Sequence, residues 1–489
     1  MVQGRVLVIA GSDSSGGAGL EADQKVIAAH GCYAMTATTA LTAQNTQGVQ
    51  GIHIIPAEFV AQQIEACIED VGVDVIKTGM LAAADTIEMV ARMVVKHKIP
   101  VLVVDPVMVS TSGAQLLPHD AIKQLSQHLL PHTTVLTPNI PEAALVLAQN
   151  GRPEVEIRSA DDLETVAREI HALGPKWVLV KGGHRPLKED LTVAETEEER
   201  KFVVDVLVGG EGEVLSVKSP YQASTSTHGT GCSLASAIAS NLAKGLDAPS
   251  AVRSACRYIE GAIRTAPGLG KGHGPLNHFH STYTLPFSPG YFLEYLLERP
   301  DVKDVWKQFV YHPFVMAMGD GTLPLESFKG FTSREPMPSL PTRHRMPRIS
   351  QESAPPRSIK ARASPFPPSP STANTIYAAC TAYTRYVLDV GQTSDWLGLQ
   401  MALAPCLLGY GAVAQMLHGH ADTQHEGNTY WAWIKNYVAD DYVEAVTLGS
   451  ELLEKHILLQ SPTRVEELVK IFIHALKMEI GFWEMFPSK

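Results

Sequence analysis

The first 280 residues predict an α/β fold with a mainly parallel sheet, and the rest of the chain predicts a separate all-helical unit. From residue 5 to about residue 280, short β-branched runs alternate with longer helical patterns, as in successive β–α–β units. From about residue 291 the strand signals stop, and apolar residues recur at helical spacing. A chain of 489 residues is also too long for one ordinary core.

The expected strands of the first unit are apolar on both faces, which is typical of a sheet covered by helices. VLVIAG precedes a helix beginning at Gly19, and VDVIKTG precedes a helix beginning at Ala83; IPVLVVDPV, TVLTPN and KWVLVKGG follow. Ligands of open α/β sheets bind beyond the carboxyl ends of the strands. We therefore expect one site to be formed by the segments that end these strands, residues 11–13, 77–80, 105–107, 137–139 and 181–184.

The sequence predicts a first domain over residues 1–280, a linker over 281–290 and a helical domain over 291–489. A charged stretch, residues 185–202, predicts a hairpin insertion without catalytic content. Within the helical domain, residues 331–375 are rich in Pro, Arg and Ser and predict disorder, because each proline costs about 3 kcal/mol inside a helix. A regulatory linker is one interpretation. We favour a non-native insert, translated from a retained intron or a shifted frame, because helical motifs resume at Ala379.

Composition points to small-molecule chemistry in a reducing compartment. A net charge of −11 and a pI near 5.9 argue against a general nucleic-acid binder. We expect no signal sequence, because the N-terminal apolar run VLVIA is too short for one, and the six cysteines form neither C-x-x-C pairs nor a dense framework. The uncharged stretch Leu399–Leu417 contains Pro, Gly and Gln and predicts a buried helix, not a membrane span. We expect a cytoplasmic protein, and homo-oligomer formation stays open.

Two glycine-rich turns stand where strands or loops lead into helices. GSDSSGGAG, residues 11–19, fits neither a dinucleotide motif nor a P-loop, and a simple β–α turn remains an alternative. THGTGCSLASA leads directly into a helix, so we expect Gly229, Thr230 and Gly231 to form an anion hole for a phosphoryl group. At the helix start, Cys232 is expected to have a lowered pKa and to act as a base. A small buried packing cysteine is the alternative.

Polar residues at the other strand ends suit a metal and a phosphate. Asn139 and Glu142 are three residues apart in TPNIPEA, and their oxygens suit Mg2+ or its waters, although a helix-capping pair is nearly as good an interpretation. Asp105 of VDPV and Lys181 of VKGGH fit Mg2+ and phosphate contacts, with ordinary surface charges as the alternative. Together these are the components of a phosphoryl-transfer site.

The motifs GSDSSGGAG, ALTAQNT, KTGML, VDPVM, TPNIPEA, VKGGH and THGTGCSL, in this order, closely resemble the hydroxymethylpyrimidine and hydroxymethylpyrimidine-phosphate kinases of thiamine biosynthesis. The resemblance implies a ribokinase-like three-layer sandwich and successive phosphorylation of a pyrimidine and its monophosphate by ATP with Mg2+. It also places Gln44 at the aminopyrimidine edge, where an amide can donate and accept hydrogen bonds. Around the ring it places Gly11, Asp23, Met80 and Val107.

Two alternatives to this activity remain open at this point. A pyridoxal-type kinase would bind a ring of similar size that also carries a hydroxymethyl group. A regulatory protein could bind the pyrimidine without catalysis, but it would not need the phosphate-binding set of Lys181, Asn139, Glu142 and Cys232.

The second unit resembles the TenA or thiaminase II family through ACTAYTRYVLDVG, MALAPCLLGYG, GNTYWAWIKNYVADDY and GFWEMF. The resemblance implies a Cys406 nucleophile, a Glu484 acid/base and ring-orienting tyrosines, Tyr383 and Tyr437. After LESFK, however, the long family helix with its Q-D-Y type motif is replaced by GFTSREPMPSL. A bundle without a central helix leaves apolar faces unpaired, so we expect this unit to be weakly folded or inactive.

Overall fold

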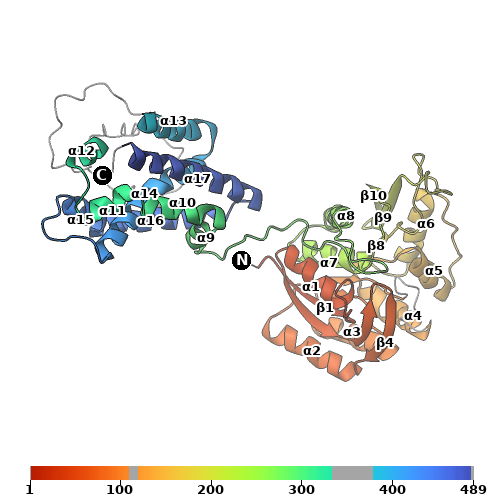
Figure 1. Ribbon diagram of the computed structural model, residues 1–489. Coiled ribbons are helices and arrows are strands. Elements are labelled where there is room, and N and C mark those ends of the chain that lie inside the picture. Colours follow the sequence, from red (N-terminus) through yellow and green to blue (C-terminus); the bar gives the residue numbers. More distant parts are fainter. Residues whose placement is uncertain (1, 109–118, 333–377, 486–489) are drawn as a thin grey trace. The chain divides into compact units, whose positions relative to one another are not determined.

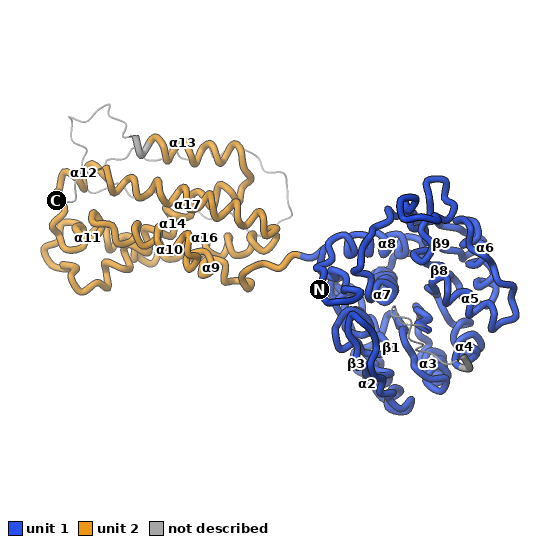
Figure 2. The backbone as a smooth tube through the Cα atoms, turned by 45° about the vertical axis from the view of Figure 1, so that its right-hand side comes forward, with its two compact units in different colours: residues 1–282 blue, residues 283–489 orange. Residues whose placement is uncertain are grey.

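The computed structural model describes residues 2–108, 119–332 and 378–485. The chain divides into two compact units, residues 1–282 and 283–489 (Figure 2). The first is an α/β unit and the second is helical, as the sequence predicts. Apart from Phe331 and Thr332, the segment 331–375, for which disorder is predicted, lies outside the described residues.

A mainly parallel sheet runs through the first unit (Figure 1). Its strands are β1 (Arg5–Ala10), β2 (Tyr33–Thr38), β5 (Val75–Thr78), β6 (Leu102–Val104), β7 (Val135–Leu136), β8 (Trp177–Val180), β9 (Phe202–Gly209) and β10 (Glu213–Pro220). They lie in the order β10-β9-β8-β7-β6-β5-β1-β2, with parallel neighbours from β8 to β2. The β8–β9 and β9–β10 pairs are antiparallel. A separate antiparallel hairpin consists of β3 (Ala40–Asn45) and β4 (Gly48–Ile54).

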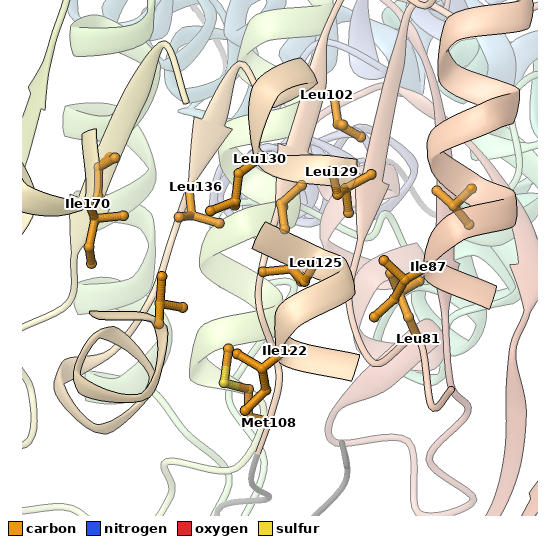
Figure 3. Close-up of a cluster of buried hydrophobic side chains, with 14 of the residues drawn as sticks. Leu81, Ile87, Leu102, Met108, Ile122, Leu125, Leu129, Leu130, Leu136 and Ile170 are labelled. Atoms are coloured by element: carbon orange, nitrogen blue, oxygen red, sulfur yellow. The ribbon is translucent and has the colours of Figure 1, made fainter. Parts of the chain in front are cut away.

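Helices cover both faces of this sheet, because alternate strand residues face opposite sides. On β1, Leu7 and Ile9 belong to one buried cluster, and Val6 and Val8 belong to another. The first cluster includes residues of α2 (Ala57–Asp70), α3 (Ala84–Lys96) and α6 (Ala160–His171). The second includes residues of α1 (Gly19–Ala29), α7 (Thr230–Ala243) and α8 (Ala248–Arg264). The result is a three-layer sandwich; Figure 3 shows labelled members of the first cluster, from Leu81 and Ile87 to Leu136 and Ile170.

The remaining helices of the first unit precede or follow β7 in the chain. They are α4 (His119–Gln124), a π-helical turn (Leu125–Leu129), a 3-10 turn (Leu130–His132) and α5 (Ile140–Gln149). The sequence prediction missed β2, the β3–β4 hairpin and the β9–β10 hairpin. It placed a hairpin instead at residues 185–202, where the structure has turns and isolated bridges. The glutamates there do not form an apolar strand pattern, whereas the run FVVDVLVG that begins at Phe202 is apolar and rich in β-branched residues.

The second unit consists of helices around an aromatic core. The helices are α9 (Phe292–Glu298), α10 (Pro300–Val310), α11 (Pro313–Gly319), α12 (Leu325–Thr332), α13 (Ala378–Thr393), α14 (Trp396–Gly419), α15 (Trp431–Tyr437), α16 (Asp440–Ile457) and α17 (Pro462–Glu484). The Trp483 ring lies 5.5 Å from Phe309 and 5.3 Å from Phe314. By length and composition α14 could span a membrane, but 61% of its apolar window is buried inside the unit. This burial favours the predicted core helix.

Candidate active site

A cavity of about 540 Å3 opens at the carboxyl ends of the parallel strands. Each of the five expected strand-end segments contributes to its lining, which confirms that they converge. The cavity also extends to residues of β9, β10 and α8, including Asp205, Ser219 and Ile259, which the sequence prediction did not include. Twelve residues expected at the site line it: Gly11, Gln44, Met80, Asp105, Val107, Asn139, Glu142, Lys181, Gly229, Thr230, Gly231 and Cys232.

The start of α7 forms one wall of this cavity. Gly229 precedes the helix with φ of 80°, a conformation that favours glycine. A Cβ at Gly229 would lie 1.9 Å from the Gly17 carbonyl oxygen, so this turn packs directly against the first glycine-rich turn. A Cβ at Gly231 would lie 3.1 Å from Lys181 Nζ. Because Gly231 has no side chain, the Lys181 ammonium group can approach the backbone N–H groups at the start of the helix. This arrangement suits a bound phosphoryl group.

Cys232 lines the cavity beside this helix start, but its thiol does not have the lowered pKa that the sequence predicts. The pKa of Cys232 is raised to about 12: burial is the largest cause, the charge of Lys77 opposes it, and the Asp23 and Asp105 carboxylates add to the rise. The helix N-terminus therefore does not outweigh desolvation here. The thiol is protonated at neutral pH in the ligand-free protein.

Lys181 connects the two carboxylates nearest the start of α7. Its Nζ lies 2.8 Å from Asp105 Oδ1 and 3.9 Å from Glu142 Oε2. Burial lowers the pKa of Lys181, but Asp105 and Glu142 more than offset this effect and raise it overall. Burial raises the pKa of Glu142 to about 7 despite the Lys181 charge. The site therefore holds a charged ammonium group with one carboxylate that titrates near neutrality.

Asn139 and Glu142 both line the cavity, and they also cap α5. Asn139 Oδ1 accepts a hydrogen bond from the Glu142 backbone N–H at 2.9 Å, and Glu142 Oε2 accepts one from the Asn139 N–H at 2.8 Å. This reciprocal pair is a capping box. The capping interpretation is therefore confirmed.

The carboxylate oxygens in the cavity suit a divalent cation that binds together with a nucleotide. Among the residues that the structure describes, no three His, Cys, Asp or Glu side chains are grouped as a metal cage. Asp105 and Glu142 do bring carboxylate oxygens to the cavity, both within 4 Å of Lys181 Nζ. Mg2+ commonly binds through one or two carboxylates, phosphate oxygens and waters, which is the arrangement these residues suit.

Asp23, expected beside the substrate ring, is not part of the cavity lining. It is fully buried, and its two carboxylate oxygens each lie 2.9 Å from Nζ of Lys77, which is also fully buried. Ser236 of α7 donates a third hydrogen bond to Asp23 at 2.7 Å. The pair thus joins α1, β5 and α7 next to the site. A lysine inside the apolar run VDVIKTG was the available sequence signal, because a buried ammonium requires an anionic partner.

Asp13, from the strand-end segment 11–13 expected at the site, and His228, to which sequence reasoning gave no role, connect the two glycine-rich turns. His228 Nε2 lies 2.8 Å from Asp13 Oδ2, and both residues are buried and line the cavity. The same carboxylate accepts hydrogen bonds from the backbone N–H groups of Gly17 and Ala18. Burial alone would raise the pKa of Asp13, but the hydrogen bonds from His228, Ser15 and Ala18 lower it to about 2.

In the second unit, three of the expected residues lie along or against α14. Burial raises the pKa of Tyr442, and Cys406 and Tyr437 raise it further, which places these residues together. Tyr383 donates a hydrogen bond to the Ala402 carbonyl at 3.3 Å, about one helical turn before Cys406. The group expected from the sequence is therefore partly assembled.

The structure does not bring Glu484 to this group. Glu484 is exposed, and its charge acts on His312, whose pKa is lowered by burial against the effect of Glu484. The carboxylate near Tyr442 is that of Glu479, which is 1% exposed and accepts a hydrogen bond from Tyr410 at 2.9 Å. Five residues correspond to a rotation of about 140° around a helix, so the two glutamates of α17 face different directions. Glu479 falls on the buried face of α17, so the helical spacing of the apolar residues could have identified it.

Two family models match the chain in succession. The phosphomethylpyrimidine kinase model matches residues 13–277. The TENA/THI-4/PQQC family model matches residues 299–334 and 370–488. The interval 335–369 between the two matched parts falls within the Pro/Arg/Ser-rich segment.

Relatives match the chain over nearly its whole length. A Schizosaccharomyces pombe protein, provisionally named as a hydroxymethylpyrimidine/phosphomethylpyrimidine kinase, is 38% identical, covering 98% of this chain and 90% of its own. A hydroxymethylpyrimidine/phosphomethylpyrimidine kinase of Saccharomyces cerevisiae is 33% identical over 98% of this chain and 94% of its own. A Bacillus subtilis pyridoxal kinase solved as an ADP complex is 32% identical, covering 56% of this chain and 97% of its own, with a TM-score of 0.48.

Proposed function

The chain belongs to the phosphomethylpyrimidine kinase family, and on this premise we propose that it phosphorylates 4-amino-5-hydroxymethyl-2-methylpyrimidine and then its monophosphate, using ATP. The reaction would supply the pyrimidine diphosphate of thiamine biosynthesis. The observation that carries this proposal is the meeting of Gln44, Cys232, Lys181 and the α7 start in one cavity.

Each of these groups has a distinct task in the proposed reaction. The Gln44 amide would bind the aminopyrimidine edge, with Gly11, Met80 and Val107 around the ring. The backbone N–H groups of Gly229 to Gly231 and the Lys181 ammonium would hold the transferred phosphoryl group and offset its charge. Cys232 would take the proton of the attacking hydroxyl group.

The high pKa of the Cys232 thiol makes the proposed proton transfer depend on pH. Because Cys232 is protonated near pH 7 before the ligands bind, only a small thiolate fraction can accept the proton. That fraction grows with pH up to about 12, so the chemical step is expected to speed up through the alkaline range. Lys77 favours the thiolate and Asp23 opposes it, so both members of this pair would act on Cys232 without touching substrate.

Mg2+ would be held by Asp105 and Glu142, with Asn139 nearby, and would neutralise phosphate charge when bound. The Lys181 ammonium would offset the repulsion between the two carboxylates. The pKa of Glu142, near 7 without ligands, is expected to fall when a cation binds, and Glu142 then releases a proton.

Phosphate transfer tests this proposal directly. The full chain is incubated with MgATP and the hydroxymethylpyrimidine, and the products are identified by mass spectrometry. We expect the monophosphate and then the diphosphate; absence of both products would overturn the kinase assignment. Pyridoxal added to the same assay as a competing substrate tests the alternative. Faster turnover of pyridoxal than of the pyrimidine would identify the protein as a pyridoxal-type kinase.

For the second unit we propose a hydrolase of thiaminase II type that uses Cys406. The proximity of Cys406, Tyr437 and Glu479 to Tyr442 supports it, and Glu479 replaces Glu484 as the carboxyl group of this proposal. The unmatched interval 335–369 supports reduced activity, because no family segment occupies it. Incubation of the full chain with thiamine or an aminopyrimidine and mass spectrometry of the products tests it; turnover that survives Cys406→Ser would refute the nucleophile.

We also propose a compartment and a set of partners for this enzyme. The five cysteines whose side chains the structure describes are free thiols, which suits a cytoplasmic enzyme. A small pyrimidine is the proposed substrate, with neither nucleic acid nor membrane as a partner; sizing of the purified chain decides between a monomer and a homo-oligomer.

A further inference from the structure

Gln44 lies between two polar neighbours that can fix the direction of its amide. It follows a bulge in β3, lines the cavity and is half-buried. One atom of its amide lies 3.4 Å from Thr42 Oγ1, and the other lies 3.3 Å from His228 Nε2. In the structure, Gln44 Oε1 faces Thr42 and Gln44 Nε2 faces His228. The two ends of an amide are nearly isosteric, so the hydrogen-bond partners decide which end belongs where.

Thr42 can only accept a hydrogen bond from Gln44. The Thr42 hydroxyl group has one proton, and it donates that proton to the Ser12 carbonyl oxygen at 2.9 Å. A carbonyl oxygen cannot donate, so the direction of this hydrogen bond is unambiguous. The Thr42 backbone N–H also donates to Ser12 Oγ at 3.1 Å, which holds the two segments together. The group of Gln44 that faces Thr42 must therefore be the amide NH2.

His228 Nε2 cannot accept a hydrogen bond from Gln44. It lies 2.8 Å from Asp13 Oδ2, and the low pKa of Asp13, about 2, keeps that carboxylate ionised and acceptor-only. Nε2 therefore carries a proton, which it donates to Asp13, and it has no lone pair left for an N–H of Gln44. The amide oxygen of Gln44, 3.3 Å away, is the end that can share this proton. Both neighbours thus favour the same orientation, reached by a half-turn of the amide.

We propose that the pairs Ser12–Thr42 and Asp13–His228 lock the Gln44 amide in one orientation, and that this lock makes the cavity select a 4-aminopyrimidine against the corresponding 4-oxopyrimidine. With one N–H committed to Thr42 and one oxygen lone pair committed to His228, Gln44 keeps one donor and one acceptor at fixed positions. The inference rests on the proposed function in one respect, namely that Gln44 faces the pyrimidine edge.

The chemistry of the two rings explains the selection. A 4-aminopyrimidine presents an amine donor next to a ring-nitrogen acceptor. The 4-oxo analogue presents an oxygen acceptor next to a ring N–H, so its donor and acceptor are exchanged. A freely rotating amide would turn by 180° and bind either ring equally well. A locked amide matches the amine and sets like groups against each other for the oxo ring, which a site built for hydrogen bonding rejects strongly.

Binding of two rings without the reactive hydroxyl group tests the lock apart from catalysis. The probes are 4-amino-2,5-dimethylpyrimidine and 2,5-dimethylpyrimidin-4-one, titrated calorimetrically into the full chain. The wild-type protein should prefer the amine. Thr42→Val keeps the side-chain shape but removes the acceptor, and the preference should fall about tenfold, equivalent to about 1.4 kcal/mol. Thr42→Ser retains the hydroxyl group and should retain the wild-type preference.

A second variant removes the other half of the lock. His228→Asn keeps a donor for Asp13 but is too short to reach Gln44, so the preference should fall again, and the double variant should bind both rings within about twofold. Equal wild-type affinities, or a parallel loss of both affinities in Thr42→Val, would overturn the inference. The kinase proposal has a separate readout: discrimination without phosphate transfer would overturn only that proposal, and transfer without discrimination would overturn only the lock.

Discussion

Removal of the Lys77 ammonium should destabilise the first unit by about 3 kcal/mol. The Lys77 and Asp23 side chains have 0% exposure, and Nζ lies 2.9 Å from both carboxylate oxygens. In Lys77→Met, Asp23 would still accept the hydrogen bond from Ser236. Breaking a buried ion pair by removing one partner costs about 3–5 kcal/mol, because the other charge is left uncompensated. The Ser236 hydrogen bond places the expected loss at the lower end.

The loss should become smaller as the pH falls. Burial raises the pKa of Asp23, and Lys77 supplies the largest opposing effect, so the variant should have a still higher pKa at Asp23. A carboxyl group whose pKa is higher in the folded state than in the unfolded state binds its proton preferentially in the folded state. The stability of Lys77→Met should therefore rise as the pH decreases from 7 towards the unfolded-state value of about 3.9.

Hydrogen exchange with mass spectrometry is the suitable assay, because it reports each unit separately. Tryptophan fluorescence would report mainly the second unit, since Trp177 is the only tryptophan before residue 283. Peptides covering β1 and β5 should lose protection in Lys77→Met, and peptides of α14 and α17 should not change. Arg168→Met is the matched control, because its partner Glu164 is 35% exposed and the pair should contribute less than about 1 kcal/mol.

Two outcomes would refute this reasoning. One is a Lys77→Met protein within about 1 kcal/mol of the wild type. The other is an Asp23→Leu/Lys77→Met double variant that is no more stable than Lys77→Met, because removing the orphaned charge should recover much of the loss.

Three further predictions concern catalysis. Gly229→Ala should lower kcat more than about 100-fold, because its Cβ would meet the Gly17 carbonyl at 1.9 Å in a left-handed turn; a kcat within tenfold of wild type would contradict this packing. Cys232→Asp should move the rising limb of the pH–rate profile from the alkaline range to below neutrality, since the thiol pKa is about 12; profiles of the same shape would exclude Cys232 as the base. Lys181→Met should lower kcat about 100- to 1000-fold while calorimetric binding of the pyrimidine persists, and a loss confined to pyrimidine affinity would move Lys181 out of the phosphate site.

The sequence predicted the sandwich because its central strands are apolar on both faces and separated by helical patterns. The expectation that ligands bind beyond the carboxyl ends of parallel strands then located most of the cavity lining, including Asp105 and Lys181. The β3–β4 hairpin was missed because it carries exposed Leu41, Ile52 and Ile54 beside Gln44 and gives no clean alternation. Long-range pairing was the other limit, since no local pattern connects Asp13 to a histidine 215 residues later.

The site electrostatics could not be predicted from motifs. A cysteine at a helix start normally favours the thiolate, but burial and two nearby carboxylates reverse that preference for Cys232. Likewise, Asp23 is placed beside the ring by resemblance, whereas the structure pairs it with Lys77. For the second unit, the position of a glutamate near the C-terminus was not enough to choose between Glu479 and Glu484, because burial made the difference.

The contact between Gly17 and Gly229 also bears on how the protein is made. The first glycine-rich turn leaves the ribosome more than 200 residues before the turn that packs against it, and the Asp13–His228 pair spans a similar interval. His228 in turn bridges to Pro275. A nascent chain can therefore bury the first strands early, but it has no complete phosphate-binding wall until synthesis passes residue 275. Fragments that end earlier should be inactive even when their sheet is formed.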